Sequence, residues 1–260
     1  MNAEEKLVTL SRRYCLEHYK YWSNVYSKRR ARIKSASYQL DRKDYDIFPR
    51  FQKLERILYG IESLVGKIFL NADDCMAQLR EAVHYHSIYL TELTTDPRAK
   101  KALLEEEMNY LAFLDGIDRA HIDEQFVMPL PYVRRLSDDE AREIRRRLQA
   151  TYQFDDFAWI PLIEVDGVKS LSFNVEEITP YQSELIQAVR SMIDGTFYQI
   201  DETGSHYEKS GSEFDLIGVE TVWCALDFEW MIYRSHEETL TFSGGKLLLV
   251  VQKIVKDSRE

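Results

Sequence analysis

The sequence contains few of the residues that mark secreted, membrane or metal-binding proteins. Its 260 residues include three cysteines, ten glycines and six prolines. Cys15, Cys75 and Cys224 are widely spaced and form no C-x-x-C pair, which indicates free thiols in a reducing cytoplasm and no zinc site. There is no apolar run of the roughly eighteen residues that a bilayer span requires, and no apolar core near the amino terminus. We therefore expect a cytoplasmic protein with neither a membrane span nor a secretory signal.

Motifs of catalysis and cofactor binding are also missing. The sequence has no P-loop, no dinucleotide-binding glycine pattern, no G-x-S-x-G, no H-E-x-x-H and no kinase motif. We therefore expect no cofactor and no metal, and we favour an interaction protein over an enzyme. Residues that are distant in sequence can still form an active site, so the enzyme class stays open.

What the sequence does contain is an uneven distribution of charge. The net charge is -10, yet residues 1–43 hold 11 Lys and Arg against 4 Asp and Glu, whereas residues 155–260 hold 8 against 20. A basic front and an acidic rear are typical of a protein with two different partners, or of two parts of one chain that attract each other. The sequence leaves both interpretations open.

The first half has the apolar spacing of amphipathic helices, at every third and fourth residue. We predict an α+β fold in which residues 1–125 form an antiparallel helical bundle and residues 126–260 form a mixed domain. The expected helices run over about 4–36, from the break at Asp46–Pro49 to Gly66, from the cap Asn71 to about Leu93, and from Pro97 to Gly116.

The second half alternates strand and helix signals, which predicts a mainly antiparallel sheet with one or two helices. Ser137 and Glu140 have the spacing of a capping box that starts a helix ending near Tyr152. A second helix is expected after Thr179-Pro180. Strands are expected over Trp159–Ile163, Leu171–Phe173 and Thr196–Ile200, and the polar residues 201–213 are predicted to form a mobile surface loop.

The end of the chain is expected to form a β-meander. Thr239–Ser243 alternates polar and apolar residues, and Gly244-Gly245 is typical of a tight hairpin turn. Lys246–Ile254 then predicts a central strand, because its LLLVV core is apolar on both faces. The pattern FEWMIYRSHEETLTFSGG, residues 228–245, resembles the carboxy-terminal strands of small bacterial immunity and defence-associated proteins. The resemblance implies an inhibitor, an immunity factor or a non-catalytic subunit of a defence complex.

Our main functional hypothesis is that the acidic half docks onto another protein with a basic surface. Acidic surfaces with exposed aromatic residues favour fast association with cationic proteins. No membrane partner is expected, and the oligomeric state stays undetermined. The candidate partner-binding residues, chosen from two polar segments expected to be exposed, are His206, Tyr207, Tyr233, His236, Glu237 and Glu238.

A first alternative is a ribonuclease. Arg80 and His86 form an R-x5-H spacing that resembles the motif of HEPN ribonucleases, in which arginine and histidine surround the scissile phosphate. The resemblance implies a catalytic role for both residues, although Glu81 after the arginine departs from the usual pattern. His84 and His86 cannot share a metal ion, because residues two apart on a helix point about 200° away from each other.

A second alternative is a nucleic-acid-binding accessory protein that uses the end of the first helix. Clustered cations near Tyr26 and Tyr38 would bind phosphates while aromatic rings stack on bases. The opposing interpretation is a cationic last turn that complements the helix dipole. The candidate residues are Lys28, Arg29, Arg30, Arg32 and Lys34.

Overall fold

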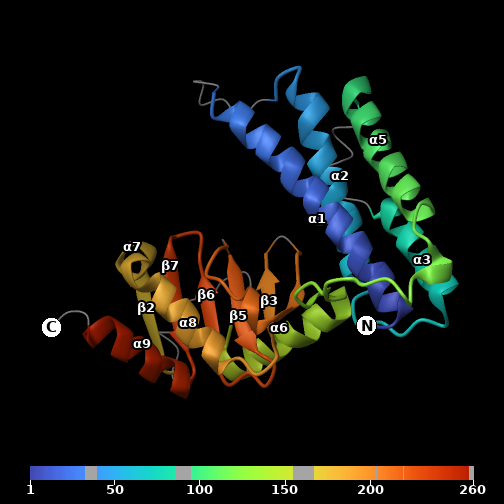
Figure 1. Cartoon of the computed structure of the whole chain (residues 1–260). Helices are drawn as coiled ribbons and strands as arrows, with labels where there is room; N and C mark the ends of the chain where they lie inside the picture. Colours follow the sequence, from blue (N-terminus) through green and yellow to red (C-terminus); the bar gives the residue numbers. More distant parts are fainter. Residues whose placement is uncertain (33–39, 86–94, 155–166, 203, 219, 258–260) are drawn as a thin grey trace. The chain divides into compact units, whose positions relative to one another are not determined.

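The computed structural model describes the chain except for residues 33–39, 86–94, 155–166, 203, 219 and 258–260 (Figure 1). The chain divides into two compact units, Met1–Leu130 and Pro131–Glu260. The first is helical and the second contains a seven-stranded antiparallel sheet, so the predicted α+β class is confirmed. Within the described ranges, no helix combines the length and apolarity that a bilayer span requires.

The helical unit is built on three longer helices, α1, α2 and α5, which lie side by side in Figure 1. Asn2 and Asn71 accept hydrogen bonds from backbone amides at the first turns of two helices, and Asp96 caps a third, as their side chains favour. The elements are α1 (Ala3–Arg30), α2 (Asp44–Glu62), α3 (Ala72–Glu81), η1 (Ala82–His84), α5 (Pro97–Asp115) and η2 (Arg119–His121).

Buried ion pairs cross the interior of this unit. Arg12 on α1 contacts Glu62 on α2 at 3.3 Å, and each residue is 5% exposed. Arg50 on α2 donates to Glu106 on α5 at 2.6 Å, and Glu106 is 1% exposed. Truncating one partner of such a pair leaves a buried charge uncompensated, which typically costs about 3–5 kcal/mol. These pairs therefore fix which helix faces meet.

Several predicted helix boundaries in this unit are wrong. The first helix, expected to reach about residue 36, ends at Arg30. Pro49 lies inside α2 because the helix already begins at Asp44, whose buried carboxylate accepts from Arg29 and Arg30 at the end of α1. The expected helix from Asn71 to Leu93 ends at Glu81. A short 3-10 turn follows, and Tyr85 is extended with φ -66° and ψ 112°.

The second unit is organised by the order of its strands, β1-β4-β3-β5-β6-β7-β2, in which all neighbours are antiparallel. The expected Trp159–Ile163 strand lies outside the described residues. The predictions of strands at Leu171–Phe173 and Thr196–Ile200 are confirmed. The strands are β1 (Val133–Arg135), β2 (Ser170–Asn174), β3 (Thr196–Asp201), β4 (Tyr207–Ser210), β5 (Thr221–Ala225), β6 (Met231–Arg234) and β7 (Thr239–Ser243).

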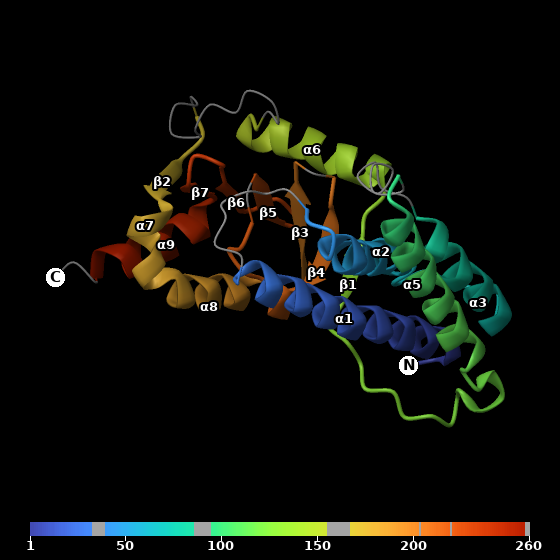
Figure 2. The same ribbon diagram turned by 90° about the horizontal axis from the view of Figure 1, so that it is seen from above.

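Helices cover both faces of the sheet (Figure 2). On β5, Val222 faces α6 (Asp138–Tyr152), and Trp223 faces the opposite side, where α8 (Gln182–Met192) and α9 (Gly245–Asp257) lie. The two side chains are 2% and 0% exposed. The unit is therefore a three-layer sandwich with an apolar core on each side of the sheet. The short elements are α7 (Val175–Ile178), η4 (Thr179–Tyr181) and η5 (Gly211–Glu213).

The predicted helix starts in this unit are confirmed. Ser137 accepts a hydrogen bond from the Glu140 amide, and the Glu140 carboxylate accepts in return from the Ser137 amide, as a capping box requires. Thr179-Pro180 opens a 3-10 turn that leads directly into α8.

The expected last strand, Lys246–Ile254, is wrong because this segment is part of helix α9. The expected β-meander is present and consists of β5, β6 and β7. The outer neighbour of β7 is β2, and not a strand that follows Gly244 in the sequence. Residues of α9 at spacings of three and four are buried, whereas Leu249 within the LLLVV run is 68% exposed. The buried set is Leu247, Leu248, Val251, Ile254 and Val255.

The two glycines between β7 and α9 give a matched test of this connection. Gly244 has φ +110°, and a Cβ there would lie 2.3 Å from the Glu229 carbonyl oxygen, whereas nothing lies within 4 Å of a Cβ on Gly245. Gly244→Ala is expected to lower the free energy of unfolding by about 1–3 kcal/mol. Gly245→Ala is expected to leave it unchanged or raise it by about 0.5 kcal/mol. Urea denaturation measures both, and equal values for the two variants would contradict the helical connection.

Candidate functional site

The ionisable residues of the second unit gather where its central strands end. Residues 1–130 hold 20 Lys and Arg against 20 Asp and Glu, and residues 131–260 hold 14 against 24, so the second unit carries the whole net charge. β3 ends at Asp201, β5 begins at Thr221 and β6 ends at Arg234, and antiparallel pairing brings these three positions to one end of the sheet. Several carboxylates lie at this end.

Glu220, which directly precedes β5, is the centre of the cluster. Its carboxylate accepts the Tyr233 hydroxyl and the His236 backbone amide, the latter at 2.6 Å, and it also contacts Nδ1 of His236. Glu220 has φ +49°, in the left-handed region that non-glycine residues rarely adopt. The carboxylate therefore ties the start of β5 to β6 and to the β6–β7 turn.

These contacts shift the pKa of all three groups. Burial raises the pKa of Glu220, but the hydrogen bonds from Tyr233 and His236 outweigh burial and lower it overall. The hydrogen bond to Glu220 and its charge raise the pKa of His236. Burial and the same carboxylate raise the pKa of Tyr233, so Tyr233 stays neutral and donates. The arrangement favours a negative Glu220 beside a protonated histidine.

Two further carboxylates act on the same groups. Glu202 and Glu237 both raise the pKa of His236 through their charge, and the Glu202 amide donates to the Glu220 carbonyl at 3.1 Å. We call Glu202, Glu220 and Glu237 the acidic rim. A hollow of about 60 Å³ lies beside it, lined by the apolar and aromatic residues Phe154, Ile200, Val222 and Tyr233 and by the charged residues Arg145, Asp201, Glu202 and Glu220. Carboxylates next to apolar and aromatic walls suit a cationic side chain with an aliphatic stem.

The exposure expected of the candidate partner-binding residues is right for three of them. The His236 side chain is 72% exposed, and Glu237 and Glu238 are also exposed in the turn after β6. Tyr233 is only 6% exposed, because it lies on β6 and faces the core beneath α6. Their role in partner binding stays a prediction.

The expected surface loop over residues 201–213 is wrong. Tyr207 begins strand β4, where it pairs with Arg135 of β1 and Gln199 of β3, and it is 8% exposed. His206 is 6% exposed, and its Nε2 lies 3.2 Å from a guanidinium nitrogen of Arg145 on α6. Burial, followed by the charge of Arg145, lowers the pKa of His206. Both residues therefore hold the sheet and α6 together and offer little surface to a partner.

The rim residues Glu202 and Glu220 are absent from the sequence-based candidates. The acidic count over residues 155–260 indicates that an acidic surface exists, but it does not say which carboxylates converge. Glu202 and Glu220 are eighteen positions apart and meet only because β3 and β5 are paired. Knowledge of the β3–β5 register, which pairs Asp201 with Thr221, would have placed the adjacent Glu202 and Glu220 together.

The basic end of α1 is largely engaged within the helical unit. Arg29 contacts Asp41 and Asp44, and Arg30 contacts Asp44, which is fully buried. Lys28 and Arg32 are exposed, and Lys34 lies outside the described residues. Two of the five candidate nucleic-acid-binding residues thus have a structural role, and the binding itself stays a prediction.

The helix that carries Arg80 in the ribonuclease alternative is shorter than expected. Arg80 forms an ion pair with Asp115 of α5, and α3 ends one residue later. His86 lies outside the described residues, and Tyr85, the last described residue before it, is extended. A catalytic role of Arg80 and His86 stays a prediction without support from this geometry.

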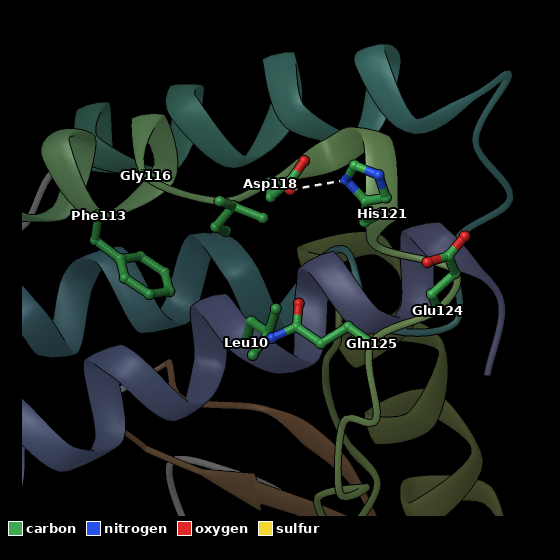
Figure 3. Close-up of a pocket in the computed structure, with 8 residues that line it drawn as sticks. Leu10, Phe113, Gly116, Asp118, His121, Glu124 and Gln125 are labelled. Carbon is green, nitrogen blue, oxygen red and sulfur yellow. Dashed lines mark hydrogen bonds and ion pairs between the residues drawn. The ribbon is translucent and has the colours of Figure 1, made fainter.

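A larger hollow of about 520 Å³ lies in the helical unit between α1 and the segment after α5 (Figure 3). His121 contacts Asp118 at 2.8 Å on its rim, and Leu10 and Phe113 line its base. Both polar side chains are about two-thirds exposed, which keeps them in contact with solvent. None of the described lining residues is a serine, threonine or cysteine.

Comparisons with known proteins identify no relative: no family model, no curated protein and no solved structure matches the chain. Among the described residues, no group of three or more His, Cys, Asp or Glu is arranged to hold a metal ion. A functional assignment therefore depends on the geometry and charge of the residues described above.

The His236–Glu220 pair predicts a pH dependence with a defined sign. Because Glu220 raises the pKa of His236, the pair stabilises the fold fully below the ordinary histidine pKa of about 6.5 and loses this contribution as pH rises through the raised value. NMR titration of the His236 ring is expected to give a higher pKa in the wild type than in Glu220→Gln. Glu237→Gln is the control and is expected to give a smaller decrease. An unchanged His236 pKa in Glu220→Gln would contradict the pair.

Proposed function

We propose that this chain is a protein-binding protein whose acidic unit docks onto a basic partner protein at the acidic rim. The observation that carries the proposal is the convergence of Glu202, Glu220 and Glu237 at one end of a rigid sheet in the unit that holds all the net charge. A surface of one charge steers an oppositely charged partner and fixes its orientation.

The rim also has the rigidity that binding requires. Glu220 is held by the Tyr233 hydroxyl and by the His236 amide, so its carboxylate is fixed before a partner arrives. A preorganised group loses little conformational entropy when it binds. Glu202 and Glu237 are exposed around it and remain available to lysine or arginine side chains of a partner.

Binding explains the rim better than catalysis. Ser235 is near His236 in sequence, but its hydroxyl contacts the Thr239 hydroxyl at 2.9 Å and its side chain is buried with the turn. A histidine that pairs with a glutamate only becomes a general base when a nucleophile lies within reach. The hydrogen bonds of Ser235 with Thr239 and of His236 with Glu220 hold the shape of this turn.

The proposal includes the class of partner suggested by the sequence. The acidic unit would act as an inhibitor or immunity factor, or as a non-catalytic subunit of a defence complex, and its partner would be the basic component. The interaction would take place in the cytoplasm, where Cys15, Cys75 and Cys224, all free and buried, stay reduced. The support for this finer statement is the resemblance of the β6–β7 segment alone.

Charge reversal at the rim tests the proposal. The double variant Glu202→Lys/Glu237→Lys is expected to slow association with the basic partner about tenfold or more, since attraction becomes repulsion at the contact. The full-length chain is used as bait in a lysate of its host, and the association rate of the recovered partner is then measured across salt concentrations. The wild-type rate is expected to fall as salt rises.

The matched control is Glu176→Lys/Glu184→Lys, which makes the same charge change at exposed positions on α7 and α8 of the same unit. This variant is expected to keep most of the association rate. Recovery of the same proteins by the rim variant and the control, with equal rates, would overturn the rim as the docking site. Recovery of only neutral or acidic partners with salt-independent rates would overturn the proposal as a whole.

A further inference from the structure

Helix α5 has a second apolar face that points away from the interior of the helical unit. Its buried residues include Leu103, Glu106 and Tyr110, which face α2 and the unit's core. On the outer side, Leu104 is 48% exposed and Met108 is 60% exposed. A surface helix normally presents polar residues to water, so a partly apolar outer face requires an explanation.

The outer residues form a narrow seam along the helix. With 3.6 residues per turn, the five seam positions fall within an arc of about 80°, opposite to the buried face. The seam carries a positive side chain at one end and a negative one at the other: Lys101 is 78% exposed and Asp115 is 63% exposed. In order, the seam consists of Lys101, Leu104, Met108, Ala112 and Asp115.

The seam positions are spaced symmetrically about Met108, with apolar residues near it and opposite charges at the two ends. Lys101 and Asp115 lie seven residues on either side of it, and Leu104 and Ala112 lie four residues on either side. If two copies of α5 meet in antiparallel orientation about a two-fold axis, each position meets its mirror position. Lys101 then faces Asp115 of the second copy twice, and the two Met108 side chains meet at the axis.

We propose that the outer face of α5 is an interaction surface for a second copy of this chain, which docks as an antiparallel, two-fold symmetric helix pair. Charge complementarity selects this occupant. A parallel pair would place Lys101 against Lys101 and Asp115 against Asp115, which is repulsive at both ends. The small Ala112 opposite the larger Leu104 lets the two helices approach closely, and methionine adapts to its own copy at the centre.

The surface makes a weak dimer rather than an obligate one. One helix face from each copy buries less than the roughly 1,600 Å² of a standard interface, and exposed ion pairs add little energy. Lys101 and Asp115 also have partners within their own chain, Glu105 and Arg80. The ion pairs thus set the orientation and register, and the apolar centre supplies the attraction.

Disulfide trapping tests the register directly, because the native cysteines are all buried. Met108→Cys is expected to form a covalent dimer of the full-length chain under mild oxidation, much faster than Tyr21→Cys, an equally exposed position on α1. A mixture of Lys101→Cys and Asp115→Cys is expected to form the mixed dimer, while each variant alone forms little. Trapping of Met108→Cys at the rate of Tyr21→Cys would overturn the proposal, and trapping of Lys101→Cys with itself would overturn the antiparallel orientation.

Charge exchange gives an independent measurement without crosslinks. Lys101→Glu and Asp115→Lys are each expected to weaken self-association about tenfold, because two attractions become two repulsions. An equimolar mixture of the two variants restores both attractions and is expected to dimerise like the wild type in sedimentation equilibrium. A mixture that associates no better than either variant alone would contradict the pairing of these residues.

Discussion

The constraint on which the second unit depends is that its central strands are buried on both faces. On β5, neighbouring residues Val222 and Trp223 point to opposite sides of the sheet, and both are inaccessible to water. A strand of this kind is stable only if a further layer covers each face. The helix α6 supplies one layer and α8 with α9 supplies the other, so the three-layer architecture follows from the composition of one strand.

The same constraint places the charges of the unit. With both faces of the sheet covered by the apolar faces of helices, ionisable side chains have low-cost positions mainly on the outer helix surfaces and at the strand ends. Glu202 and Glu220 therefore come together beyond the ends of β3 and β5. Glu220 then needs compensation for its partial burial, which Tyr233 and His236 provide. An acidic and well-ordered rim is thus a consequence of the fold, and its use for binding requires no additional structural element.

The sequence was sufficient for local features and insufficient where an interpretation depended on tertiary context. The caps Asn71 and Ser137 and the helix-starting Pro97 act on backbone groups a few positions away, so the sequence predicts these helix starts directly. The run LLLVV near Leu249 is different, because a two-faced apolar segment fits a central strand and a helix packed on a sheet alike. The central strand is in fact β5, and this run belongs to the helix that covers it.

Two failures in the candidate residues have the same origin. Residues 201–213 lack an apolar period, yet His206 and Tyr207 are buried because β4 pairs on both sides with distant segments, β1 and β3. Pairing supplies the backbone with hydrogen bonds whatever the side chains are, so a polar sequence can still form an inner strand. The candidates whose expected exposure is confirmed, His236, Glu237 and Glu238, lie in a turn, where exposure follows from local geometry.

Helix α5 of the helical unit has an inner face and an outer face that differ in where their charges lie. The inner face of α5 contains Glu106, a buried carboxylate that must meet Arg50 of α2, whereas its outer face is apolar at the centre and charged only at its ends. If α5 rotated to bury the outer seam against α2, Glu106 would be released to water and Arg50 would lose its contact with this buried carboxylate. The buried ion pair therefore specifies which face is internal, as a single polar position does in a helix pair. Because that choice is fixed by charge, the second apolar face remains on the surface, available to another helix.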